Sequence, residues 1–168
     1  MPLILRSLTL AGALFGAAAF SQFPEFSQQY MQRLGGAVDA LGEVTADFDA
    51  SATAAGLSRE AALAQLRGTP FLERRRVDMT RAFARHARMQ ADLAVLEGAG
   101  PFMRAYRLPH LTDGQIARAA WAVYQPAVPL NFAGVIFAGV GFLLGWIVFG
   151  ILLRLLAWPF RARSASAA

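Results

Sequence analysis

The side chains that could carry acid–base or metal chemistry are few and scattered along the chain. The only histidines are His86 and His110, and cysteine is absent. Without cysteine there is no thiol nucleophile, no thiolate metal site and no disulfide. No HExxH pattern accompanies either histidine, and a pairing of His86 with Asp92 or Glu97 has no spacing that favours catalysis. The sequence therefore predicts no catalytic residues, no metal ligands and no cofactor, and we expect a protein that is not an enzyme.

Arginine is the most conspicuous charged residue, and its distribution limits the kinds of partner. The formal net charge is +5. No acid precedes Pro24 or follows Leu130, whereas the segment between them carries all the acids and is close to neutral. The unopposed arginines therefore flank the apolar chain ends, as the positive-inside rule describes for cytoplasmic flanks of membrane spans. They are Arg6, Arg154, Arg161 and Arg163. This distribution excludes nucleic acid as the expected partner.

A second basic stretch lies in the middle of the chain, from Arg74 to Arg88. It could attract an anionic partner, but Asp78 and Asp92 stand one turn after arginines in the same stripe. Pairs at this spacing contribute about 0.2 to 0.5 kcal/mol each and are typical of a solvated helix face. We interpret the stripe as solvent-exposed.

The rest of the chain is organised around two apolar stretches. Phe132 to Leu153 contains no charged residue, and as a helix it is roughly 33 Å long, enough to cross the bilayer core. Pro2 to Phe20 is also apolar but is interrupted by Arg6. It fits a retained span with Arg6 at the cytoplasmic headgroups, and it also fits a signal peptide cleaved after the Ala17 to Ala19 run. We expect the retained span.

Small residues recur at helical spacing in both stretches. Lipid provides no hydrophobic drive for helix association, so small side chains that let backbones approach become a means of pairing. The predicted packing positions are Gly12 and Gly16 in the first stretch and Gly134, Ala138, Gly141 and Gly145 in the second. Each set contains a GxxxG motif. The sequence leaves open whether the ridges pair within one chain or between protomers.

Aromatic and basic residues near the ends of the spans are expected at the membrane interface, where amphipathic rings and cationic groups anchor helices. The predicted interface residues are Arg6, Trp121, Tyr124, Arg154, Trp158 and Arg161.

Between the spans the periodicity is helical throughout. Pro24 is expected to break or bend the first helix, because proline lacks the amide donor. A narrow apolar seam then steps by three and four from Met31 to Ala55, and Gly56 closes it. The seam consists of Met31, Leu34, Val38, Leu41, Thr45, Phe48, Ala52 and Ala55.

Helix caps divide the remainder of this segment. Ser58 predicts the start of a short helix ending near Gly68, and Thr69-Pro70 predicts the next start. That helix carries Leu72, Met79, Phe83, His86, Leu93 and Leu96 on one side, and with the seam helix it is expected to form an antiparallel hairpin. Phe102 to Leu108 is expected as a short helix between prolines. Thr112 with Gln115 predicts a capping box for the last helix, and Asn131 is expected to cap the second span.

Two segments resemble a known family. They are SQFPEFSQQYMQRLGGAVDAL at Ser21 to Leu41 and QPAVPLNFAGVIFAGVGFLLGW at Gln125 to Trp146. The chain resembles the proteobacterial domain-of-unknown-function family 2937, small membrane proteins with hydrophobic ends. The resemblance implies the bacterial inner membrane as the setting, and it implies no activity.

We therefore predict an all-α membrane protein with two transmembrane helices at the chain ends flanking a helical extramembrane hairpin domain. The expected parts are residues 2–23 (first span or signal peptide), 24–129 (periplasmic domain), 130–158 (second span) and 159–168 (disordered cytoplasmic tail), with both termini cytoplasmic.

The expected function is that of a non-catalytic accessory, scaffold or assembly subunit of an inner-membrane complex. Its partners would be the lipid bilayer and other integral membrane subunits, or further copies of the chain. The alternative is a periplasmic sensor or binding module for a small apolar ligand or lipid, held near Phe102, Met103, Tyr106 and Trp121.

Overall fold

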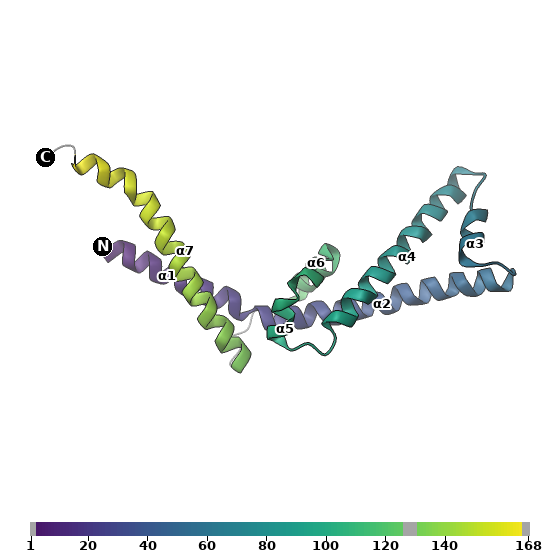
Figure 1. The fold of residues 1–168 in the computed structure, drawn as a ribbon, viewed down its shortest axis with the longest axis horizontal. Coiled ribbons are helices and arrows are strands. Elements are labelled where there is room, and N and C mark those ends of the chain that lie inside the picture. The colour runs from purple at the N-terminus through teal and green to yellow at the C-terminus, as the bar shows by residue number, and fades with distance from the viewer. Residues whose placement is uncertain (1–2, 126–130, 166–168) are drawn as a thin grey trace. The chain divides into compact units, whose positions relative to one another are not determined.

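The computed structural model describes residues 3–125 and 131–165, with side chains described up to residue 156. Every regular element in these ranges is helical (Figure 1). The elements are α1 (Leu3–Ser21), α2 (Phe23–Ala54), α3 (Arg59–Gln65), α4 (Pro70–Leu96), α5 (Pro101–Tyr106), the 3₁₀ turn η1 (Leu108–His110), α6 (Gly114–Val123) and α7 (Phe132–Ala165). The predicted all-helical class is confirmed for the described ranges.

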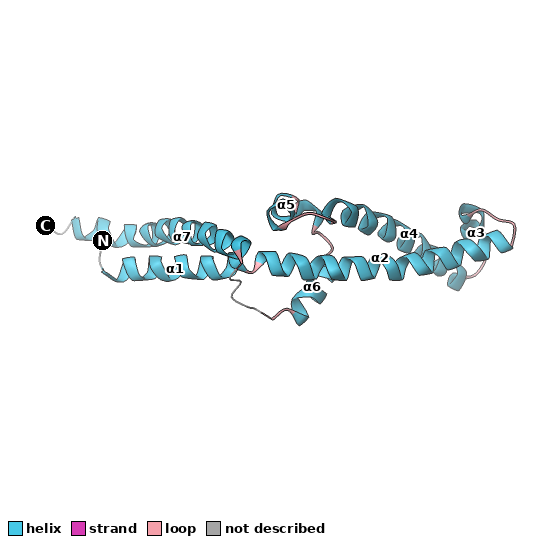
Figure 2. Ribbon diagram, turned by 90° about the horizontal axis from the view of Figure 1, so that it is seen from below, coloured by secondary structure: helices cyan, strands magenta, loops and turns pink. Residues whose placement is uncertain are grey.

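The chain divides into two compact units. The terminal unit contains residues up to Ser27 and from Tyr124 onward, and the central unit contains Gln28–Val123. In the terminal unit α1 and α7 lie side by side and form the most extensive helix pairing among the described residues (Figures 1 and 2). The central unit contains most of α2 together with α3 to α6.

Within the part of the chain that the structure describes, two helical runs are long and apolar enough to cross a membrane, Leu3–Ala54 and Phe132–Leu156. Only 17% of the most apolar window of the first run is buried within the protein, and only 6% of that in the second. A core helix of a soluble protein would bury most of this surface, so these helices present apolar side chains outward. Both could span a bilayer.

The break between α1 and α2 lies at Gln22, two positions before Pro24. The amide of Gln22 bonds to the Ala19 carbonyl in a tighter turn, and Phe26 resumes the helical ladder with Gln22. Pro24 sits in the first turn of α2, where its missing amide costs no helix bond. An interruption between two helices is therefore present, but it precedes the predicted position at Pro24 by two residues.

At the other end, α7 continues to Ala165. The sequence predicts a disordered tail from residue 159, and the described part of that tail is instead helical. Leucine, alanine and arginine are strong helix formers and follow the apolar stretch, so the helix can propagate past it. Residues 166–168 of the predicted tail lie outside the described residues.

The central unit uses the predicted seam as its core. Leu34, Val38 and Thr45 are buried along α2, whereas Ala55 at its end is exposed. On α4, Met79 and Leu96 are buried as predicted, and Met89 on the same stripe is buried as well.

Three of the four predicted caps are correct. Ser58 Oγ accepts from the Ala61 amide at the start of α3, and Thr69 Oγ1 accepts from the Leu72 amide at the start of α4. Asn131 Oδ1 accepts from the Gly134 amide at 2.8 Å, which caps α7. The short helix α3 ends at Gln65, slightly before the predicted end near Gly68. The predicted helix from Phe102 is α5, which ends at Tyr106 and is followed by the 3₁₀ turn.

The predicted capping box of α6 is wrong. The helix begins one position later than expected, at Gly114, and Asp113 is its cap. Asp113 Oδ1 accepts from the amides of Gln115 at 2.9 Å and Ile116 at 3.1 Å. A carboxylate is a stronger acceptor than the Thr112 hydroxyl and also suits the positive end of the helix dipole.

Candidate functional site

The contact between α1 and α7 is built on glycine. A β-carbon added to Gly16 would lie 2.3 Å from the carbonyl oxygen of Gly141, and one added to Gly141 would lie 2.3 Å from the carbonyl oxygen of Gly16. One turn away, a β-carbon on Gly145 would lie 2.5 Å from the Gly12 carbonyl oxygen. Real β-carbons do not approach backbone atoms this closely, so only glycine permits this separation of the two helices.

The structure thus brings together four of the six predicted packing positions within one chain. Gly134 is buried and Ala138 is half-buried along the same helix. The ring of Phe149 lies over Gly12, which has no side chain to displace it. Because rising numbers on α1 meet falling numbers on α7, the two helices are antiparallel. That the pairing of α1 with α7 depends on these residues stays a prediction.

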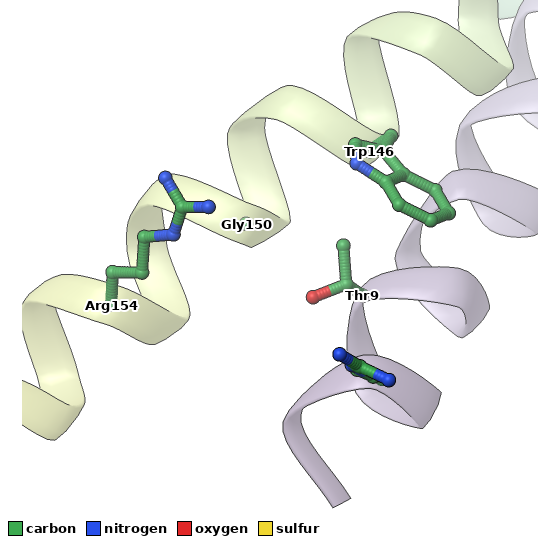
Figure 3. Close-up of a pocket in the computed structure, with 5 residues that line it drawn as sticks. Thr9, Trp146, Gly150 and Arg154 are labelled. Carbon is green, nitrogen blue, oxygen red and sulfur yellow. The ribbon is translucent and has the colours of Figure 1, made fainter. Parts of the chain in front are cut away.

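Toward the N-terminal end of α1, the two helices line an open-sided cavity of about 410 Å³. It is lined by Arg6 and Thr9 from α1 and by Trp146, Gly150 and Arg154 from α7. Figure 3 shows Thr9 on one helix and Trp146, Gly150 and Arg154 along the other. We call this cavity the arginine notch. Two predicted interface residues, Arg6 and Arg154, are therefore brought to one site, which the sequence reasoning did not foresee.

The other predicted interface residues have separate surroundings. Tyr124 is buried; its hydroxyl donates to Gln22 Oε1 at 2.6 Å, and its ring meets Phe26 edge to face. Trp121 is exposed in the central unit. The side chains of Trp158 and Arg161 lie outside the described residues.

A polar cluster ties the helices of the central unit together. The Asp113 amide donates to the Tyr30 hydroxyl at 3.1 Å, and Arg85 Nη2 donates to Asp113 Oδ2 at 3.2 Å. Close by, His110 Nδ1 lies 2.9 Å from Asp92 Oδ1. The cluster thereby joins α2, α4, η1 and the start of α6. Sequence reasoning missed it because its members are far apart in the chain and each is common on helix surfaces.

The cluster changes the ionisation of two of its members. Burial raises the pKa of Tyr30, and the nearby carboxylates of Asp113 and Asp92 act in the same direction. Burial also acts to raise the pKa of Asp113, but the amides of Ile116 and Gln115 and the charge of Arg85 outweigh it and hold that pKa below its usual value. Asp113 is therefore ionised in the folded protein near neutral pH.

His86 lies beside α2, with Nε2 3.5 Å from the position that a β-carbon on Gly42 would occupy. Next to it, the rings of Phe48 and Phe83 meet edge to face at 5.4 Å. His86 is half-buried on the apolar side of α4, as expected from its spacing. Within residues 3–125 and 131–165, no three histidine, aspartate or glutamate side chains are grouped closely enough to hold a metal ion.

The residues expected around an apolar ligand in the alternative function are all exposed. Tyr106 exposes 83% of its surface and Trp121 exposes 65%. Phe102 and Met103 are also exposed. These four side chains lie exposed on α5 and α6, and this exposure gives no specific support to an enclosed ligand site.

We expect Tyr30→Phe to lower the stability of the central unit by about 1 kcal/mol, because the Asp113 amide loses its acceptor at a part-buried position. The measurement is chemical unfolding of the full chain in detergent, followed by helical circular dichroism. Tyr106→Phe is the matched control, since the Tyr106 side chain is exposed. An equal effect of both substitutions would contradict the proposed role of the Tyr30 hydroxyl.

A family model described as "Protein of unknown function (DUF2937)" matches residues 4–162, nearly the whole chain. The chain belongs to the DUF2937 family. The expected resemblance is thus confirmed, and the match covers both apolar helices and the central unit of this DUF2937 protein. No curated protein and no solved structure matches the chain significantly.

Proposed function

We propose that this DUF2937 protein is a non-catalytic accessory, scaffold or assembly subunit of a bacterial inner-membrane complex. The observation that carries the proposal is the exposure of large aromatic side chains on the central unit, Tyr106 and Phe71. The glycine contact between α1 and α7 would make these helices a self-contained two-span anchor, and it occupies the surface that GxxxG motifs often offer to other proteins. Partner recognition would then fall to other faces of the chain.

The proposed topology places α1 and α7 across the membrane at the two chain ends, with both termini cytoplasmic. The basis is the four arginines of the flanks, which no acid opposes. The central unit would be a periplasmic helical hairpin made chiefly by α2 and α4, since long loops cross the membrane largely regardless of their charge.

Exposed apolar side chains of the central unit support a role in protein contact. Tyr106 and Phe71 expose 83% and 75% of their surface. Large exposed aromatic residues are enriched at the centres of protein interfaces, where they contribute much of the binding energy. The arginine stripe of α4 instead has the mixed charge of a solvated face, so we expect partner contacts at the aromatic residues.

Photocrosslinking in intact cells tests this proposal. A photoreactive amino acid at position 106 is expected to give a discrete crosslinked product with an integral membrane protein or a second copy of the chain. The matched control places the same residue at position 88, which is exposed on the charged face of α4. Products of equal yield at both positions, or none at either, would contradict a specific scaffold role.

Topology is tested separately with reporter fusions. Fusions after residue 168 and at the Gly98 turn between α4 and α5 are expected to report the cytoplasm and the periplasm, respectively. The opposite result at either position would contradict the proposed orientation without bearing on the crosslinking result.

A further inference from the structure

The arginine notch has a position that follows from the register of the two apolar helices. Gly16 meets Gly141, Gly12 meets Gly145, and a β-carbon on Gly150 would lie 3.8 Å from Thr9 Cγ2. The next turn along this antiparallel pair places Arg6 of α1 level with Arg154 of α7. Both side chains line the same cavity of about 410 Å³.

No acidic residue in the described part of the chain neutralises these two guanidinium groups locally. Neither arginine forms an ion pair with any residue in the described ranges, and the sequence has no acid before Glu25 or after Asp113. Thr9 contributes no counter-charge, and its hydroxyl donates to the Leu5 carbonyl at 2.8 Å. The notch is therefore a concave cationic site between two apolar helices, which is the arrangement that favours an anionic group.

The walls of the notch continue as an apolar surface. A second hollow of about 340 Å³ shares Trp146, Gly150 and Arg154 with the notch and adds Ile147 and Ile151. Trp146 and Arg154 lie about 12 Å apart along the helix axis. We call the part of this hollow beside Trp146, Ile147 and Ile151 the apolar trough. The cationic notch and the adjoining trough together match a molecule with an anionic head and a hydrocarbon tail.

We propose that the arginine notch binds the phosphate-bearing headgroup of an anionic phospholipid, with an acyl chain lying along the trough beside Trp146. Arg6 and Arg154 would supply the hydrogen-bond donors, one from each helix, and Arg is suited to paired donation to phosphate oxygens. The inference rests on the proposed two-span topology, which places both arginines at the cytoplasmic leaflet.

The test uses the full chain with Trp146 as its single tryptophan, in the variant Trp121→Phe with Trp158→Phe. The protein is reconstituted into vesicles of equal amounts of phosphatidylglycerol and phosphatidylcholine, with bromine on the acyl chains of one lipid or the other. Because both leaflets have the same composition, the orientation of the inserted chain does not affect the result. We expect Trp146 to report a roughly tenfold preference for phosphatidylglycerol, from its stronger quenching by the brominated form.

Three variants assign the preference to the notch. Arg6→Gln with Arg154→Gln is expected to bring the preference close to one. Arg6→Lys with Arg154→Lys should retain part of it, because the charge remains while the planar donor geometry is lost. Arg161→Gln with Arg163→Gln removes the same two charges from positions further along the chain and should leave the preference unchanged. If all flank arginines act only as topology signals, this double variant would have the same effect as the loss of both notch arginines, and the proposal would be overturned.

Two further outcomes would overturn the proposed lipid site. Equal quenching by both brominated lipids in the chain with its arginines intact would overturn the lipid site. Loss of the preference on addition of inorganic phosphate, but not of chloride at the same ionic strength, would assign the notch to a free anion instead. Flotation of the protein with the vesicles after an alkaline carbonate wash separates these results from failure of the chain to insert, since the wash removes a chain that is bound only at the surface. The reporter fusions test the two-span topology independently.

Discussion

Replacing Gly16 by isoleucine is expected to separate α1 from α7. The new β-carbon would meet the Gly141 carbonyl oxygen at 2.3 Å, and backbone atoms on both sides leave no flexible group to yield. Overpacking of a close contact costs about 1 to 3 kcal/mol where neighbours can adjust, and the rigid backbone here places the expected loss at or above ~3 kcal/mol. That loss corresponds to a shift of more than about 100-fold in the pairing equilibrium.

Engineered cysteines report the pairing, because the chain has none of its own. Thr9→Cys with Gly150→Cys places two thiols across the helix contact, and we expect efficient oxidation to a disulfide in the otherwise unchanged chain. Adding Gly16→Ile should abolish most of this crosslink. The same substitution at Gly139 is the control, since a β-carbon there meets nothing within 4 Å.

Two results would contradict this prediction. A crosslink that survives Gly16→Ile would show that the helices do not depend on the glycine contact. An equal loss with Gly139→Ile would show that isoleucine disturbs α7 or the membrane in general. Gly12→Ile is also expected to weaken the crosslink, because the new β-carbon would lie 2.7 Å from Phe149 Cβ, an atom that rotation of the ring does not move.

Replacing Asp113 by alanine is expected to destabilise the central unit by about 2 to 3 kcal/mol. The change removes the cap of α6, which contributes about 1 kcal/mol in typical helices, and a charge-assisted bond to Arg85 at 3.2 Å. It also leaves Arg85 part-buried without its carboxylate, and Arg85 Nε already lacks a hydrogen-bond partner among the described residues. Chemical unfolding of the full chain in detergent measures the change.

Asp113→Asn separates the two contributions. Asparagine caps helices about as well as aspartate, so the remaining loss of stability reports the ion pair with Arg85. Asp49→Asn is the matched control, because Asp49 pairs with Arg59 at an exposed site where solvent screens the interaction. An effect of Asp113→Ala no larger than that of Asp49→Asn would contradict the role of the polar cluster.

The pH dependence of the same variant gives an independent check. The folded-state pKa of Asp113 lies below its usual value, so its stabilising contribution is present above the unfolded pKa of about 4. It is lost as pH falls through the lower folded-state pKa. We therefore expect the stability difference between the unchanged chain and Asp113→Asn to be constant near neutral pH and to shrink below about pH 4. A difference that grows on acidification would contradict this assignment.

Several features of this DUF2937 protein were determined by local sequence alone. Helix periodicity and apolar length depend only on neighbouring residues, so the helical class and both apolar runs could be predicted without a structure. The caps at Ser58, Thr69 and Asn131 are equally local, because each side chain bonds to an amide a few residues ahead. The cap of α6 was mispredicted, since two adjacent acceptors competed there and long-range contacts from Tyr30 and Arg85 favour Asp113.

Only the tertiary structure determined which of these helices pack against each other and in which register. The spacing of the glycines shows that each apolar helix has a face without side chains, but no spacing within a helix says which other helix fills it. The register of α1 against α7 resolves this, because the backbone approach of Gly16 to Gly141 occurs in only one alignment. The same alignment brings Arg6 and Arg154 to one notch, although they lie near opposite ends of the chain and the sequence alone explains each of them as a flank charge.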